Sequence, residues 1–203
     1  MRSRALSPDE AVESLDTIRT VLARTTRYTH ISWVGIALAG TIGLATSAGA
    51  WLFDVSPREA PREFLLLWCT ALVGALGGGL WTTVRKARRA REAVFGRKLQ
   101  VVSLGVLPSL VAAALVTCVL VQSGALDLAP GFWALFYGLG ILAVSHVLDW
   151  EFQVTAWAFL VASAASFFLL RGAPHLAMMV TFGAIHLVLG VFRCKKEGAC
   201  QPG

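Results

Sequence analysis

Residues 101–122 read VVSLGVLPSLVAAALVTCVLVQ and contain no charged side chain. A helix of about 20 apolar residues crosses a hydrocarbon core of about 30 Å, and this stretch is long enough to do so. Because the bilayer core offers no water to unpaired main-chain groups, such a segment crosses it as a helix. The stretch therefore predicts a transmembrane helix, and a membrane protein is the first expectation for the chain.

The composition of the chain supports the same expectation. Of its 203 residues, 56% are hydrophobic and only 15% are charged, and the mean hydropathy is +0.67. Soluble domains carry about 25% charged residues, so this composition excludes an ordinary soluble domain. The net charge of +6 does not indicate nucleic acid binding, because the basic residues stand beside apolar stretches rather than on a separate polar domain.

Five further apolar stretches are long enough to be spans, separated by connections rich in Gly and Pro. The sequence therefore predicts an all-α polytopic membrane helix bundle of six transmembrane helices over residues 30–193, followed by a tail over residues 194–203. The spans are expected at about Ile31–Phe53, Phe64–Val84, Val101–Gln122, Phe132–Leu148, Val154–Leu170 and Pro174–Phe192.

The distribution of basic residues predicts the orientation of the bundle. In a six-span chain, fifteen of the eighteen Lys and Arg residues fall on one side, in the N-terminal arm, in the loop after the second span and in the tail. The other side carries Arg58, Arg62 and Arg171. Because loops rich in Lys and Arg stay in the cytoplasm, both termini are expected to be cytoplasmic.

The N-terminal arm, residues 1–29, is expected to form an amphipathic helix. Ser7 to Glu10 is typical of a helix start, and an apolar residue then recurs at helical spacing from Ala11 to Leu22. Such a helix lies at the membrane surface, and the alternative is a docking helix for a protein partner. The residues expected to contact a cytoplasmic partner or anionic lipid headgroups are Arg19, Arg24, Arg27, Arg85, Lys86, Arg88, Arg89 and Arg91.

Small residues recur every four positions in the first two spans. They are Gly35, Ala39, Gly43 and Ser47 in the first span and Ala71, Ala75 and Gly79 in the second. Small side chains let membrane helices approach closely, which favours packing of these two spans against each other. The alternative is the seam of a homodimer.

Glycine and proline also interrupt the apolar pattern, at Gly77–Gly79 in the second span and at Pro108 in the third. In membrane helices these residues are common as kinks and close contacts. The alternative is a broken helix that exposes main-chain groups to a substrate, as in a small transporter or channel subunit.

The spans contain few residues that could support chemistry. No Asp, Glu, Lys or Arg stands in the middle of a predicted span, and no motif of a hydrolase, nucleotide-binding protein or metalloenzyme is present. No catalytic residue and no metal site are therefore predicted. Asp149 and Glu151 follow the fourth span and are expected to pair with the basic loop or to face water. Cys194 and Cys200 lack the tight spacing of zinc ligands.

Two histidines, His146 and His186, are expected at similar depth in two different spans. The favoured interpretation is that each forms a hydrogen bond within the bundle, so no cofactor is predicted. The alternative is that the two residues bind the iron of a b-type haem.

Three segments together resemble a known group of proteins. They are the arm from Ser14 to Thr29, the sequence WALFYGLG at residues 133–140 and the sequence FGAIH at residues 182–186. They resemble a family of small, uncharacterised bacterial integral membrane proteins with an N-terminal helical arm and about six spans. The resemblance implies a bacterial cytoplasmic (inner) membrane location. It transfers no activity, and the winged-helix regulators that accompany such proteins favour a regulatory role.

The sequence thus leads to the hypothesis of a non-enzymatic integral membrane protein that acts through protein partners, in a regulatory or scaffold role. A small transporter or channel subunit is the alternative from another class. A haem-binding membrane redox protein is the third hypothesis.

Overall fold

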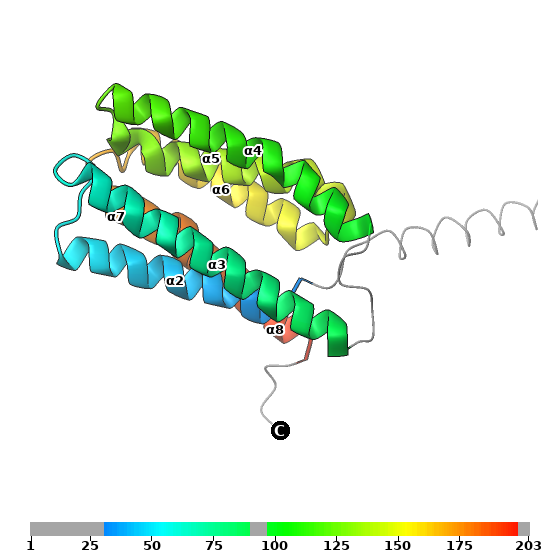
Figure 1. The fold of residues 1–203 in the computed structure, drawn as a ribbon. Coiled ribbons are helices and arrows are strands. Elements are labelled where there is room, and N and C mark those ends of the chain that lie inside the picture. The colour runs from blue at the N-terminus through cyan, green and yellow to red at the C-terminus, as the bar shows by residue number, and fades with distance from the viewer. Residues whose placement is uncertain (1–30, 90–96, 199–203) are drawn as a thin grey trace, which may run out of the picture.

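The computed structural model describes residues 31–89 and 97–198 (Figure 1). Within these ranges every regular element is a helix and none is a strand. Six helices are long and apolar enough to cross a membrane, which agrees with the predicted all-α class and with a multi-pass membrane protein. The predicted amphipathic arm lies outside the described residues.

The helices follow one another with short connections. The first three spans are α2 (Trp33–Leu52), α3 (Pro61–Arg89) and α4 (Arg97–Gln122). The fourth consists of the 3₁₀ turn η1 (Leu126–Leu128), α5 (Ala129–Val144) and the 3₁₀ turn η2 (Ser145–Val147), and the fifth is α6 (Trp150–Phe168). The sixth begins as α7 (Pro174–Met178), widens into the π-helical segment η3 (Met179–Ile185) and ends as α8 (His186–Lys196).

Two helices continue past the C-terminal ends of the apolar stretches from which they were predicted. The second span is expected to end at Val84 and the sixth at Phe192, but α3 continues to Arg89 and α8 to Lys196. The added turns are basic, and cations at a helix C-terminus interact favourably with the helix dipole. Hydropathy marks the apolar part of a helix and not its end, because a helix can continue into the headgroup region.

The six spans form two layers of three (Figure 1). In one layer α2 lies between α3 and the sixth span, and in the other α5 lies between α4 and α6. The layers meet chiefly where η3 packs against α6 and where α7 approaches α5 and α6. The central helices α2 and α5 therefore make most of their contacts with protein, whereas α3 and α4 leave long apolar faces exposed, with side chains such as Val73 and Leu115.

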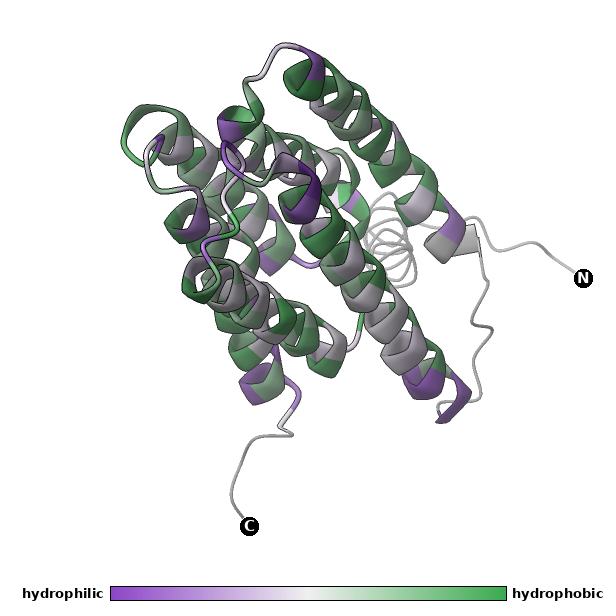
Figure 2. Cartoon of the chain, turned by 60° about the vertical axis from the view of Figure 1, so that its left-hand side comes forward, coloured by the Kyte–Doolittle hydropathy of each residue, from purple (hydrophilic) through white to green (hydrophobic). Residues whose placement is uncertain are grey.

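Two buried clusters hold the layers together. The larger one joins Ile36 of α2 to side chains of α5, α6 and α8, including Phe159 and Leu189. The second joins Phe64 and Trp68 of α3 to Leu120 of α4, and it also contains Leu126, Ala129 and Met178. Hydrophobic residues run along the helices and hydrophilic residues gather toward their ends, as expected when lipid surrounds the middle of the bundle (Figure 2).

The small residues of α2 pack against two different neighbours. A Cβ atom added at Gly35 would lie 3.0 Å from the Cα of Gly79 in α3, so this position packs closely against the second span. A Cβ at Gly43 would overlap the main chain of Phe182 in η3. Ser47 on the same stripe is fully buried, and Ala39 is half-buried. Ala71 and Ala75 of the matching stripe on α3 are half-buried.

The glycine run of α3 does not interrupt the helix. The main chain is α-helical through Gly77, Gly78 and Gly79 from Pro61 to Arg89. A Cβ at Gly78 would meet the side chain of Leu38 in α2, whereas Gly77 faces open space. Pro108 is exposed within α4, which also runs as one helix from Arg97 to Gln122. These residues thus occupy close contacts and lipid-facing positions of continuous helices.

Candidate functional site at the basic end

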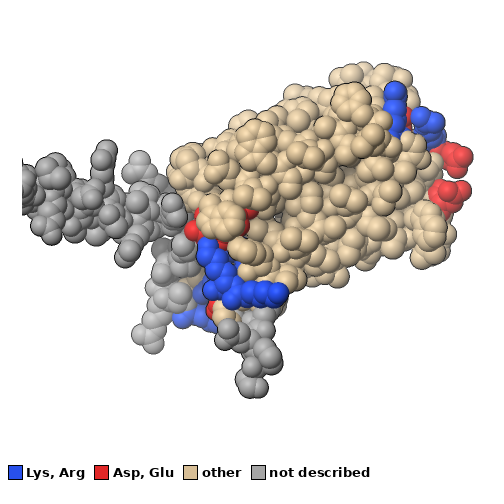
Figure 3. Space-filling model, turned by 180° about the vertical axis from the view of Figure 1, so that it is seen from behind, with Lys and Arg blue, Asp and Glu red and all other residues tan. Residues whose placement is uncertain are grey.

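Charged side chains gather at the two ends of the bundle (Figure 3). One end contains the last turns of α3 and α8 and the first turn of α6, and we call it the basic end. The basic residues at this end whose side chains the structure describes are Arg85, Lys86, Arg88, Arg89, Arg193, Lys195 and Lys196.

The last turns of α3 present an exposed basic stripe. Trp81, Arg85 and Arg88 are all exposed and follow one another at helical spacing, with Arg89 beside them. The guanidinium carbon of Arg85 lies 5.5 Å from the ring centre of Trp81, within the range of a cation–π contact. Trp is typical of membrane interfaces, so this pair marks the level at which α3 leaves the hydrocarbon.

A group of charges with a buried centre lies at the same end, and we call it the charge cluster: Asp149, Glu151, Arg193 and Lys196. The Nη1 atom of Arg193 donates to Asp149 at 2.9 Å and to Glu151 at 3.0 Å. Lys196 donates to the same Glu151 oxygen at 2.8 Å. The side chains of Arg193 and Glu151 are only 4% and 3% exposed, so solvent screens this pair little.

Helix geometry explains why these charges lie together. Asp149 is the N-cap residue of α6 and Glu151 is in its first turn, where carboxylates interact favourably with the helix dipole. Arg193 and Lys196 are in the last turn of α8, where cations do so. Because α6 begins and α8 ends at the same end of the bundle, the two favourable positions meet.

The charge cluster extends to α3 through Glu197. One carboxylate oxygen of Glu197 accepts a hydrogen bond from Lys86 at 2.8 Å, and the other lies 3.6 Å from Nη2 of Arg193. Arg193 also lies over the ring of Phe152, at 5.2 Å. The ends of α3, α6 and α8 are thereby joined by charge-assisted hydrogen bonds.

Two buried atoms of the charge cluster lack a hydrogen bond to the described residues: Oε2 of Glu151 and Nε of Arg193. The sequence expectation for Asp149 and Glu151 named the basic loop or water, whereas both residues pair with the C-terminal helix. The signal was present in the sequence, since acidic residues open one span and basic residues close another on the same side. Periodicity alone does not show which two helix ends are adjacent.

A second polar feature lies deeper in the bundle, where Tyr137 of α5 meets His186 of α8. The Tyr137 hydroxyl lies 2.9 Å from Nε2 of His186. The rings of Phe159 and Phe182 pack around this pair, with ring centres 4.8 and 5.6 Å from that of Tyr137. His186 is buried and follows η3 directly, and its Nδ1 has no well-formed hydrogen bond among the described residues.

The two histidines considered as haem ligands occupy different environments. His146 is exposed in η2, whereas His186 is buried and its Nε2 faces Tyr137. Across residues 31–89 and 97–198, no three His, Cys, Asp or Glu side chains are grouped so as to hold a metal ion. In the structure His186 contacts Tyr137, a partner that could not be read from the spacing of the histidines.

Some residues predicted to contact a partner or lipid cannot be placed. Arg19, Arg24, Arg27 and Arg91 lie outside the described residues. Arg85, Arg88 and Arg89 are exposed at the basic end, and Lys86 is half-buried through its contact with Glu197.

Comparison of the chain with family models, with curated proteins and with solved structures found no match.

Proposed function

We propose that this chain is a non-enzymatic integral protein of a bacterial inner membrane, with both termini in the cytoplasm, that acts by binding a cytoplasmic protein partner at its basic end. The observation that supports this proposal most is the charge cluster. It holds the ends of α3, α6 and α8 in one arrangement, and the exposed arginines of α3 project beside it.

The chemistry of the surface indicates the kind of partner. Arg85, Arg88, Arg89 and Lys195 are exposed, whereas Asp149 and Glu151 are taken up by internal pairs. The exposed side chains that are not held in internal pairs therefore carry positive charge. They complement an acidic protein surface that lies close to the membrane. The predicted arm would add Arg19, Arg24 and Arg27 to the same side, and anionic headgroups would surround this surface.

Site-specific photo-crosslinking in intact membranes tests this function. A photoreactive residue at position 85, 88 or 89 is expected to form a discrete adduct with a protein, and the same residue at position 62, at the opposite end, is not. Replacing Arg88 and Arg89 by Glu is expected to abolish the adduct formed from position 85. An unchanged adduct in that variant, or equal adducts from position 62, would contradict the proposal.

Deletion of residues 1–28 separates the contribution of the arm. Loss of the adducts is expected if the arm and the basic end form one surface. If the adducts remain unchanged after the deletion, the arm takes no part in partner binding.

A second candidate, a small transporter or channel subunit, draws on the partly buried Tyr137–His186 pair beside η3, because π-helical turns are frequent at functional sites. It needs a water-accessible path through the layers. If cysteines introduced at positions 74–80 are all unreactive toward a water-soluble thiol reagent, a transport path lined by the glycine run is excluded.

The haem hypothesis is tested by the absorption spectrum of the purified protein, since a haem protein has a Soret band.

A further inference from the structure

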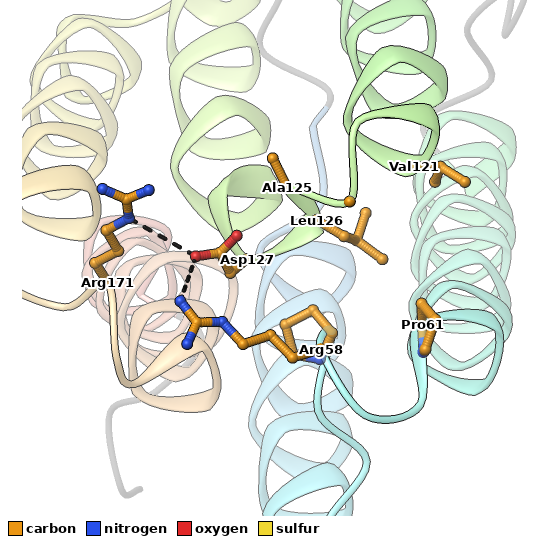
Figure 4. Close-up of a pocket in the computed structure, with 9 residues that line it drawn as sticks. Arg58, Pro61, Val121, Ala125, Leu126, Asp127 and Arg171 are labelled. Atoms are coloured by element: carbon orange, nitrogen blue, oxygen red, sulfur yellow. Dashed lines mark hydrogen bonds and ion pairs between the residues drawn. The ribbon is translucent and has the colours of Figure 1, made fainter.

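Three connections meet at the end of the bundle opposite the basic end. Arg58 comes from the link between α2 and α3, Asp127 from η1, and Arg171 from the link between α6 and α7 (Figure 4). Arg58 donates to Oδ2 of Asp127 at 2.9 Å, and Nε of Arg171 lies 3.7 Å from the same oxygen. We call these three residues the arginine clasp.

The arginine clasp borders an open depression of about 480 Å³. Its walls include the apolar side chains of Pro57, Pro61, Val121 and Leu126 (Figure 4). The depression therefore combines a charged edge with an apolar wall.

The charges of the clasp do not cancel. Two guanidinium groups share one carboxylate, which leaves a net charge of +1. A guanidinium has five N–H donors in a planar fork, so each arginine keeps donors after its contact with Asp127. The side chains of Arg58 and Arg171 are 70% and 62% exposed, whereas that of Asp127 is 9% exposed. The accessible part of the clasp is therefore cationic and suited to an oxyanion such as phosphate.

The level of the depression indicates where such an anion would come from. Two of the candidate spans meet here: Pro61 begins one and Gln122, next to Val121, ends another. Phospholipid headgroups lie at the level of span ends. The two helices that border the depression, α3 and α4, also expose apolar side chains, such as Leu66 and Val119.

We propose that this depression binds the phosphodiester headgroup of an anionic phospholipid, with Arg58 and Arg171 donating to the phosphate oxygens and Asp127 holding the two arginines in place. The site lies at the other end of the molecule from the partner-binding surface and does not depend on it.

Native mass spectrometry of the full chain in detergent tests this site. The protein is titrated with dioleoylphosphatidylglycerol, with dioleoylglycerol, which has the same acyl chains and no phosphate, and with inorganic phosphate. Wild type is expected to retain phosphatidylglycerol in preference to the other two. Arg58→Gln and Arg171→Gln are each expected to weaken its retention about fivefold, from the contribution of one basic residue near a membrane surface.

Arg62→Gln is the matched control. It removes the same charge from an exposed residue at the same end that does not line the depression, and it is expected to leave lipid retention unchanged. Equal weakening by Arg62→Gln would assign the effect to overall charge and overturn the proposal. Equal retention of dioleoylglycerol would assign binding to the acyl chains and also overturn it, and stronger binding of inorganic phosphate would overturn the choice of a lipid.

Asp127→Asn separates binding from folding. Asn keeps a carbonyl oxygen that can accept from the two arginines but removes the competing negative charge and raises the net charge of the clasp to +2. The variant is therefore expected to retain phosphatidylglycerol at least as tightly as wild type. If Asp127→Asn and the two arginine variants all lose lipid together with thermal stability, the clasp is only a structural tie between loops, and the proposal is wrong.

Discussion

Glu151 and Arg193 stand 42 positions apart in the sequence and at 3.0 Å in the structure. Each is among the least exposed charged side chains of the described chain, and each retains one polar atom without a hydrogen bond. A buried ion pair gains little over an apolar pair, but removal of one partner leaves an uncompensated charge. We therefore interpret this pair as the residue-level feature on which the shape of the basic end depends.

Replacing Arg193 by Met is expected to destabilise the protein by about 1–3 kcal/mol, because Glu151 would keep only Lys196, whose side chain is 46% exposed, as a cationic partner. Reversible unfolding in mixed detergent micelles measures this change. Arg85→Met is the control, since Arg85 is exposed, and it is expected to change stability by less than about 0.5 kcal/mol. Arg193→Met combined with Glu151→Gln is expected to recover part of the loss. If the single Arg193 variant is as stable as the Arg85 variant, the pair has no structural importance.

At the scale of single elements, α2 shows how one helix supports two neighbours in a membrane. Lipid provides no hydrophobic drive between helices, so close main-chain approach supplies much of the packing energy. Gly35 provides this approach toward α3, and Gly43 provides it toward η3. The wide turn of η3 thus packs directly against a glycine, and a larger residue at Gly43 would displace it.

Gly43→Ala is expected to destabilise the protein by about 1–3 kcal/mol, because the new methyl group would overlap the main chain of Phe182, which cannot rotate away as a side chain can. Gly49→Ala in the same helix meets nothing within 4 Å and is expected to be neutral or to stabilise by up to about 1 kcal/mol through helix propensity. Thermal unfolding followed by circular dichroism compares the two. Equal effects of the two substitutions would contradict the packing described for α2 and η3.

At the scale of the whole molecule, the two ends differ in chemistry. Charged side chains gather at both ends (Figure 3). The basic end combines exposed arginines with the charge cluster, and the opposite end carries the smaller arginine clasp. This asymmetry underlies the proposal that the basic end lies in the cytoplasm, because basic residues near span ends favour that side.

Thiol labelling in intact cells tests the orientation. Single cysteines are introduced at Arg62 and at Lys195 in a chain whose native cysteines are replaced. A membrane-impermeant maleimide is expected to label position 62 in intact cells and position 195 only after permeabilisation. The reverse pattern would invert the proposed topology. Labelling of both positions in intact cells would contradict the five spans that lie between positions 62 and 195.

The sequence by itself was sufficient for the class of the fold and the number of candidate spans. An uncharged stretch such as Val101–Gln122 must satisfy its own main-chain hydrogen bonds in lipid, so its helical state is a local property that hydropathy can detect. The basic residues that follow the second span are likewise visible in the sequence. Hydropathy could not locate the ends of α3 and α8, because helices do not stop where the hydrocarbon stops.

Only the tertiary structure decided which elements and side chains meet. The stripe containing Gly35 and Gly43 indicated close packing but not that it serves two neighbours, and no periodicity marked the π-helical turn before His186. Pairing of Glu151 with Arg193, and of Asp127 with Arg58, depends on which helix ends become adjacent once the two layers assemble. Such contacts join distant parts of the chain, so they follow from the packing of whole helices and not from the residues beside them in the sequence.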